Sequence, residues 1–108
     1  MSRGEIWSVA GGVYASKPRP AVLLQDDRFD ATDSVTVCPL TTTEVAAPLL
    51  RVPVSTDGVS GLDAASWVMI DKITTVRRAH VRQRIGRLSS TQLVQVERLI
   101  MAFLGLAD

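Results

Sequence analysis

Polar and apolar residues alternate in short runs along the first half of the chain, which is the pattern of half-buried β-strands. The first run is Glu5–Val9 and ends at a glycine pair; the second starts at a proline-bounded arginine and reaches about Gln25. A third run covers Ser34–Leu40. Pro39 cannot donate a backbone hydrogen bond, so this strand is expected to end or bend there. These runs predict a hairpin followed by a third strand.

Two or three further strands are expected in the second half. Alternation at residues 50–54 predicts a fourth strand, followed by a turn rich in glycine. A fifth β segment covers Ser66–Asp71, and its pattern allows continuation to Val76. A last short strand fits Arg84–Leu88. Five or six short strands separated by turn residues predict a small β-barrel.

The last segment changes to a helical pattern. Ser89 followed three residues later by Gln92 is a capping-box signature, and we expect a helix from about Ser90 to Leu104. Apolar residues fall into two sets, which predicts burial against both the barrel and a partner. The first set is Leu93, Val96, Ile100, Phe103 and Ala107, and the second is Val94, Leu99 and Met101.

Composition limits the remaining choices. A chain of 108 residues with 46% hydrophobic and 21% charged residues predicts one globular domain over residues 1–108. A net charge of +1 excludes binding of nucleic acid by bulk attraction, so any electrostatic site must be local. The single Cys38 excludes an intrachain disulfide and a cysteine-based zinc site, which favours a reducing cytoplasm. No apolar run approaches the roughly 20 residues of a membrane span, and we expect a soluble, unexported protein.

One arginine stands between two prolines at the start of the second strand. Each proline fixes its own φ near about −65° and disfavours helical geometry in the preceding residue, so Arg19 is expected to be extended. Its guanidinium therefore leaves the strand in a restricted direction, and its planar donor fork suits a phosphate. The alternative is an ordinary surface arginine at a strand start.

Five motifs in order carry a resemblance to a known family. The chain resembles the MazF/PemK family of toxins from Arg3 to Leu104. Each motif is weak alone, and five in register are specific. The motifs are Arg3-Gly4-Glu5-Ile6-Trp7, Arg19-Pro20-Ala21-Val22-Leu23, Val37-Cys38-Pro39-Leu40-Thr41-Thr42, Ile85-Gly86-Arg87-Leu88-Ser89 and the terminal helix.

The resemblance implies a mainly β fold, an SH3-like β-barrel with a C-terminal helix, assembled as a homodimer. It also implies a toxin that cleaves single-stranded RNA (mRNA, tRNA or rRNA) at short sequences without a metal or cofactor, and that a cognate MazE-like antitoxin neutralises. In that family the arginine of the Arg-Pro motif and the first threonine after the Pro-x motif lie at the scissile phosphate. These positions are Arg19 and Thr41 here.

Further residues are candidates for RNA binding. Lys17 is a second phosphate contact or a solvated lysine, and Thr42 and Thr43 help to position the strand. By family position, Trp67 stacks on a base, although a strand tryptophan is often part of a core. Asp71 matches an aspartate that some members use, and we interpret it as a recognition residue or as a strand-end carboxylate.

Two departures from the family pattern affect catalysis. Many relatives carry a glutamate or histidine in the loop between the first two strands, and the loop Ala10–Ser16 has neither. Met69 stands where PemK-type members have an arginine. The resemblance therefore leaves Arg19 with Thr41 as the catalytic pair and leaves the general base unassigned.

Other residues have weaker claims. The basic segment Arg77–Arg87 could follow an RNA backbone or form a solvated face, and Tyr14 could stack on a base. His80 is the only histidine, but nothing in the spacing places it near the proline-bounded arginine, so we interpret it as a structural or surface histidine. Trp7 is assigned to packing and Cys38 to a small buried side chain.

Two other function classes fit the same fold. An inhibitory toxin of the gyrase-poison type depends on a C-terminal tail that contains tryptophan, and this chain ends Leu104–Asp108 without one. An SH3-like adaptor needs an aromatic groove for proline-rich peptides, and 5% aromatic residues is lean for that role. The endoribonuclease toxin is the favoured interpretation.

Overall fold

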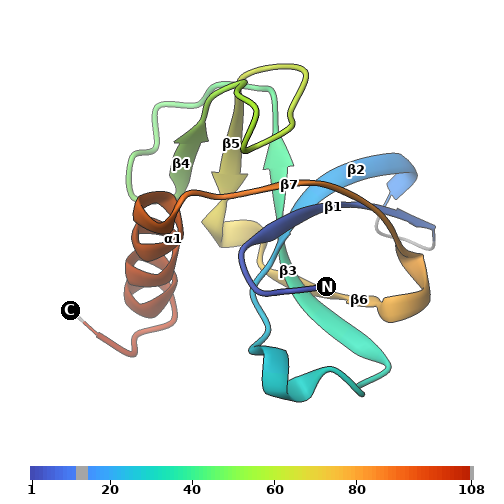
Figure 1. The fold of residues 1–108 in the computed structure, drawn as a ribbon. Coiled ribbons are helices and arrows are strands. Elements are labelled where there is room, and N and C mark those ends of the chain that lie inside the picture. The colour runs from blue at the N-terminus through green and yellow to red at the C-terminus, as the bar shows by residue number, and fades with distance from the viewer. Residues whose placement is uncertain (12–14, 108) are drawn as a thin grey trace.

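The computed structural model describes residues 1–11 and 15–107. Its first half is an antiparallel sheet of three consecutive strands (Figure 1). They are β1 (Glu5–Gly11), β2 (Ala15–Leu23) and β3 (Ser34–Thr41). A short 3₁₀ turn, η1 (Asp27–Phe29), joins β2 to β3. The predicted hairpin and third strand are therefore confirmed.

The free edge of β3 is shared by two later strands. The first half of β3 pairs with β6 (Thr74–Arg77), and its last two residues pair with β5 (Ser66–Met69). β4 (Arg51–Val54) pairs with β5, and β7 (Val81–Arg87) pairs with β1. The sheet order is β4-β5-β3-β2-β1-β7, with β6 attached to β3.

β3 branches, since β5 and β6 both pair with the same edge of it, and the sheet is open. The predicted mainly β fold with a C-terminal helix is confirmed, but the word barrel describes it only loosely. Within the described residues, no strand pairing links β7 to β4 or to β6. A 3₁₀ turn, η3 (Arg78–His80), carries the chain from β6 to β7 instead.

Four details of the expected strands differ. β2 begins at Ala15, before the proline-bounded arginine, and β7 begins at Val81 and not at Arg84. Pro39 does not end its strand, because β3 continues through it to Thr41. The expected continuation from Ser66 to Val76 is interrupted by a 3₁₀ turn, η2 (Ile70–Lys72). Residues 69–73 lie opposite only residues 38 and 39 of β3, so the chain must turn to pass from one half of the sheet to the other.

Apolar side chains fill both faces of the central strands. On one face of the sheet, Val9, Ala21 and Leu23 pack with residues of β3, β6 and β7. On the other, alternate residues such as Ile6 and Val22 join a larger cluster with β4, β5 and the terminal helix. Burial on both faces fixes the register of β1, β2 and β3, because a slip by one residue would exchange the two sets.

The helix α1 (Ser90–Phe103) stands beside β4 (Figure 1). It begins at the predicted capping box: Ser89 Oγ accepts from the Gln92 N–H at 3.1 Å, and Gln92 Oε1 accepts from the Ser89 N–H at 2.8 Å. Val96 is fully buried against the larger cluster, whereas Phe103 is 46% exposed. The apolar stripe therefore reaches the core over only part of its predicted length. No helix among the described residues is long and apolar enough to cross a membrane.

The turn between β4 and β5 packs tightly under β7. Asp57 Oδ1 accepts from the N–H groups of Val59 and Ser60, at 2.9 Å and 2.7 Å. The Arg87 N–H donates to the Val59 carbonyl at 2.9 Å, and the buried Gly86 precedes Arg87 in the strand. This contact ties the β4–β5 half of the sheet to the β1–β7 half.

Candidate active site

A pocket of about 600 Å³ opens where the end of β3 meets β2, β5 and η2. We call it the Arg19 pocket. Two cations and five hydroxyl groups line it, and no carboxylate occurs among its described lining residues. Such a composition favours an anion. The lining residues are Arg19, Pro20, Pro39, Leu40, Thr41, Thr42, Thr43, Ser66, Met69, Lys72 and Thr74.

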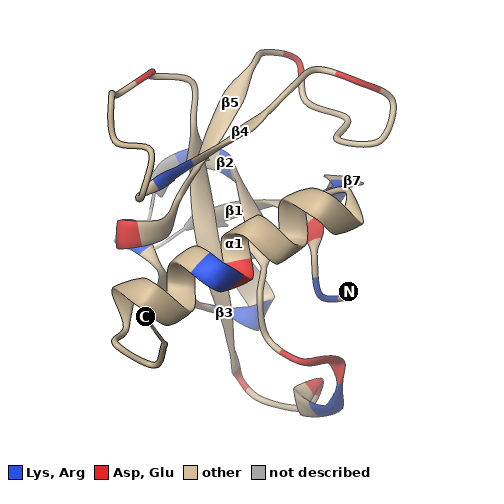
Figure 2. Ribbon diagram, turned by 90° about the vertical axis from the view of Figure 1, so that its left-hand side faces the viewer, with Lys and Arg blue, Asp and Glu red and all other residues tan. Residues whose placement is uncertain are grey.

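The positive charge that favours an anion is local to the Arg19 pocket, because the net charge of the chain is only +1. Figure 2 shows charged residues spread over several elements. Four ion pairs within 4.0 Å occur among the described residues, and neither Arg19 nor Lys72 belongs to any of them. Both cations are therefore available to a ligand. The described residues include no group of three or more His, Cys, Asp or Glu side chains that could hold a metal ion.

Arg19 lies in the middle of β2 with an exposed side chain. It is paired with Val9, and Pro20 is paired with Ser8, so the predicted extended backbone is confirmed. The flanking prolines cannot donate backbone hydrogen bonds, but their φ angles are fixed. This stretch of β2 is also paired with β1. The guanidinium is thus mounted on a backbone with little freedom.

The threonines meet Arg19 at the exit of β3. Thr41 is the last residue of β3, and its Oγ1 accepts a hydrogen bond from the Thr43 N–H at 3.1 Å. A hydroxyl that accepts keeps its own proton to donate. Thr42 and Thr43 are exposed and also line the pocket. The structure therefore brings together four of the seven residues that the sequence pointed to.

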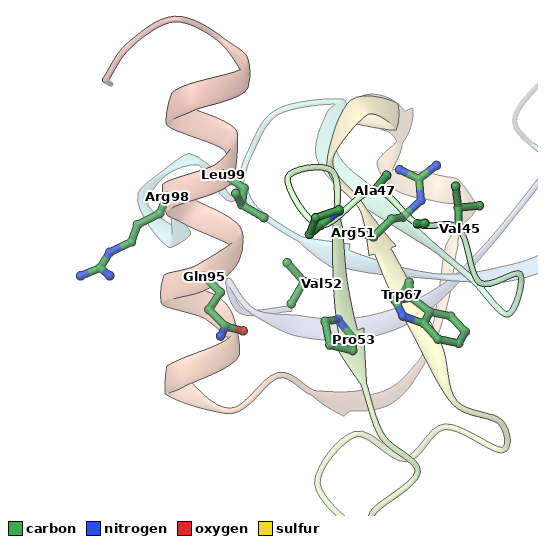
Figure 3. Close-up of a pocket in the computed structure, with 11 residues that line it drawn as sticks. Val45, Ala47, Arg51, Val52, Pro53, Trp67, Gln95, Arg98 and Leu99 are labelled. Carbon is green, nitrogen blue, oxygen red and sulfur yellow. The ribbon is translucent and has the colours of Figure 1, made fainter.

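Trp67 lies on a different pocket. Its backbone is directly opposite Thr41, but its half-buried side chain lines a groove of about 510 Å³ between β4, α1 and the loop after β3 (Figure 3). Arg51, Pro53 and Leu99 line the same groove. Lys17 is exposed on β2, two residues before Arg19, and is not a lining residue of the Arg19 pocket.

Asp71 is held by an arginine that the sequence did not indicate. Arg51 Nη1 donates to Asp71 Oδ1 at 2.5 Å and also to the Leu50 carbonyl at 2.9 Å. The Arg51 side chain is only 12% exposed. It reaches Asp71 because strand pairing places Arg51 opposite Met69. Direct contact between Asp71 and a base stays a prediction.

The ion pair affects the titration of Asp71. Burial raises the pKa of its carboxyl group, but the hydrogen bond and the positive charge of Arg51 outweigh burial, so the pKa lies below its usual value. The unfolded chain therefore takes up this proton at higher pH than the folded chain does. The contribution of Asp71 to stability is present at neutral pH and is lost as the pH falls through the lowered pKa.

We expect Asp71→Asn to flatten the acid side of the stability curve. In urea titrations between about pH 7 and pH 3, the free energy of unfolding of the parent should fall as Asp71 becomes protonated, and the variant should lose less. Asp63→Asn is the control, since Asp63 forms no ion pair among the described residues. Equal pH slopes for the parent and Asp71→Asn would contradict this assignment.

Sequence reasoning missed Lys72, Ser66 and Thr74, which line the Arg19 pocket. Lys72 is one of only two lysines and follows Asp71 directly, and that was the one available signal. The other two depend on strand pairings between distant segments. Met69 also lines the pocket, where it supplies an apolar wall.

The weaker candidates lie elsewhere. His80 is half-buried in η3, and Arg84 is paired with Glu5 at 2.7 Å. Trp7 packs against the smaller apolar cluster, as predicted. Cys38 is buried, and burial together with the nearby charge of Asp71 raises the pKa of its thiol to about 12. Tyr14 lies outside the described residues.

Comparisons with known proteins show the family of the chain. Residues 2–104 match the family described as PemK-like, MazF-like toxin of type II toxin-antitoxin system. A Mycolicibacterium smegmatis protein named "Probable endoribonuclease MazF" is 49% identical over 108 residues, covering 99% of each chain. These findings support the endoribonuclease interpretation, and not the gyrase-poison alternative.

Solved structures show the same fold. The Mycobacterium tuberculosis toxin MazF-mt6 superposes with a TM-score of 0.82 at 27% identity, over 96% of this chain and 99% of that one. A mycobacterial endoribonuclease solved in complex with its cognate antitoxin gives a TM-score of 0.81 at 19% identity, over 100% and 98%. The chain belongs to the PemK-like, MazF-like toxins of type II toxin-antitoxin systems.

Proposed function

We propose that this toxin cleaves single-stranded RNA at short sequences, with the 2′-hydroxyl of the substrate as the nucleophile and without a metal ion. The observation that carries the proposal is the Arg19 pocket, in which the Thr41 hydroxyl and a guanidinium that forms no ion pair with any described residue face the same cavity. Attack by the 2′-hydroxyl needs no external nucleophile. The protein has to align that oxygen, stabilise the crowded phosphorane and move two protons.

Arg19 is the electrostatic stabiliser in this mechanism. Negative charge builds on the non-bridging phosphate oxygens in the transition state, and a preorganised guanidinium aimed there lowers the barrier. Arginine keeps its protons, so we assign no general-acid step to it. Thr41 donates its hydroxyl hydrogen to a phosphate oxygen while the Thr43 N–H fixes its rotamer. The general base is not assigned.

The remaining candidates hold the rest of the RNA. Thr42 and Thr43 contact the nucleotide beside the scissile phosphate, and Lys17 contacts a phosphate further along β2. Trp67 stacks on a base that has passed from the Arg19 pocket across β5. Asp71 accepts from a base edge, or acts only through its ion pair with Arg51.

We further propose a cytoplasmic homodimer that a MazE-like antitoxin inhibits. Several large apolar side chains at the end of the chain are exposed, which supports self-association through this region. An acidic, flexible antitoxin segment would meet the cations of the Arg19 pocket and compete with RNA. The exposed apolar residues are Val94, Met101, Phe103, Leu104 and Leu106.

The test is cleavage of a defined RNA in EDTA. We expect cleavage at one short motif with a 2′,3′-cyclic phosphate on the upstream product, because the 2′-oxygen displaces the 5′-oxygen. The DNA oligonucleotide of the same sequence should bind without being cut. A single 2′-O-methyl group at the cleaved nucleotide should block that cut alone. Cleavage that stops in EDTA and returns with Mg²⁺, or cleavage of the DNA, would disprove the mechanism.

A further inference from the structure

We propose that Lys72 is a second phosphate-binding residue of the Arg19 pocket, and that the Arg51–Asp71 ion pair positions the turn that carries it. The inference rests on the proposed RNA substrate and adds a residue and a support to it. Arg19 and Lys72 reach the same cavity from different elements, β2 and η2. Two cations on separate elements can contact two successive phosphates of one strand.

The surroundings of Lys72 leave its charge available to a ligand. Its side chain is exposed, it forms no ion pair within 4.0 Å among the described residues, and hydroxyls and apolar groups surround it in the pocket. The carboxylate next to Lys72 in the sequence, Asp71, is already paired with Arg51.

The turn η2 is held in place by a buried side chain and by hydrogen bonds. Ile70 is fully buried in the larger apolar cluster, and its N–H donates to the Leu50 carbonyl at 3.0 Å. Arg51 Nη1 donates to the same carbonyl and to Asp71 Oδ1, so one guanidinium joins the start of β4 to the turn. Ile73 then closes the turn with a hydrogen bond to the Ile70 carbonyl at 3.3 Å. The Lys72 side chain therefore extends from a turn that is hydrogen-bonded at its start and at its end.

The guanidinium of Arg51 is only partly satisfied by hydrogen bonds. Its Nε is buried and has no hydrogen-bond partner among the described groups, although Nη1 makes two bonds. A buried charge with an unpaired donor costs stability. Arg51 Nη1 nevertheless joins the Leu50 carbonyl to Asp71, so the role that we assign to Arg51 is to position the turn that carries Lys72.

The experiment compares Lys72→Met with the parent on the same RNA. We expect kcat/KM at about 150 mM salt to fall about tenfold, mainly through KM, because a contact to a neighbouring phosphate stabilises bound substrate and transition state alike. The plot of log(kcat/KM) against log[salt] should become shallower by about 0.7, the value for one phosphate contact on a single strand. Lys72→Arg should restore most of both quantities.

Arg28→Met is the matched control. It also removes one positive charge, but Arg28 lies on η1 before the start of β3, whereas the Arg19 pocket lies at the end of that strand (Figure 1). Its salt slope should equal that of the parent. If Lys72→Met leaves KM and the salt slope unchanged, or shifts them no more than Arg28→Met, Lys72 does not bind phosphate.

The positioning role is tested by combining variants. Arg51→Met should raise KM severalfold and reduce the salt slope in the parent, but should add almost nothing in the Lys72→Met background. Additive losses would show that Arg51 acts independently and would overturn its positioning role. Arg51→Lys, which keeps the charge but loses the planar donor fork that joins the Leu50 carbonyl to Asp71, serves in the same combination if Arg51→Met fails to fold.

Binding to an uncleavable RNA separates this inference from the proposed function. An oligonucleotide with 2′-O-methyl groups throughout reports phosphate contacts without chemistry. If the parent binds it but no RNA is ever cleaved, the proposed reaction fails, while the difference in salt slope still tests Lys72. If the parent cleaves RNA and Lys72→Met binds this oligonucleotide with the parental slope, only the inference fails.

Discussion

Arg19→Ala should lower kcat/KM for RNA cleavage by roughly 10²- to 10³-fold and leave the protein folded. The loss is large because a guanidinium that faces the transferring phosphoryl group stabilises charge that develops only in the transition state. The fold should persist, because the Arg19 side chain is exposed and is in no ion pair among the described residues. Single-turnover cleavage with enzyme in excess, over a range of enzyme concentrations below saturation, measures kcat/KM, and thermal unfolding checks the fold.

Two further variants sharpen this result. Arg19→Lys keeps the charge but loses the planar donor fork, so it should fall between alanine and the parent. Arg28→Ala removes an exposed arginine elsewhere and should cleave as the parent does. An Arg19→Ala protein with parental activity would remove this residue from the mechanism. Growth arrest by an Arg19→Ala protein that cuts no RNA would indicate inhibition by binding, as in the gyrase-poison class.

The second large effect concerns folding. Gly86→Ala should destabilise the protein by roughly 3–5 kcal/mol, out of the about 5–15 kcal/mol typical of a domain. An added Cβ at Gly86 would lie 2.2 Å from the Ser60 carbonyl oxygen and 2.5 Å from that of Val59. Both are backbone atoms of a turn fixed by hydrogen bonds, so no side chain can move aside. We expect a melting temperature at least about 10 °C lower.

Gly58→Ala is the control in the same turn. Its Cβ would meet nothing within 4 Å, so its stability should stay within about 0.5 kcal/mol of the parent. Urea unfolding of the three proteins gives the comparison. If Gly86→Ala and Gly58→Ala have the same midpoint, β7 and the turn can separate at little cost, and the tight contact between them is not needed for stability.

The sequence predicted the elements better than their connections. Alternation placed β1, β3 and β4, and the capping box placed the start of α1, because these signals act over a few neighbouring residues. The break at Ile70–Lys72 was missed because the apolar run itself continues. The chain turns there because β5 and β6 pair with different parts of the same edge of β3. That pairing is a property of the assembled sheet.

The same limit explains what was found of the candidate site. Arg19 and Thr41 carry local signals, a proline on each side of one and a strand exit for the other, and family resemblance joined them. Arg51 carries no such signal. Its partner lies 20 residues away in the sequence, and the two meet only because β4 pairs with β5 in one register. Trp67, predicted to stack on a base, lines the neighbouring groove, and its contact with RNA stays a prediction.

The branching of β3 also has a consequence during synthesis of the toxin. The first hairpin can form soon after β2 is made, and it already presents Arg19. The pocket around that residue needs Thr41 from β3 and Lys72 from beyond β5, and both are fixed only when the two later strands have divided the edge of β3 between them. An incompletely folded or truncated chain therefore lacks the assembled Arg19 pocket, and we expect it to be inactive until β5 and β6 have both paired with β3.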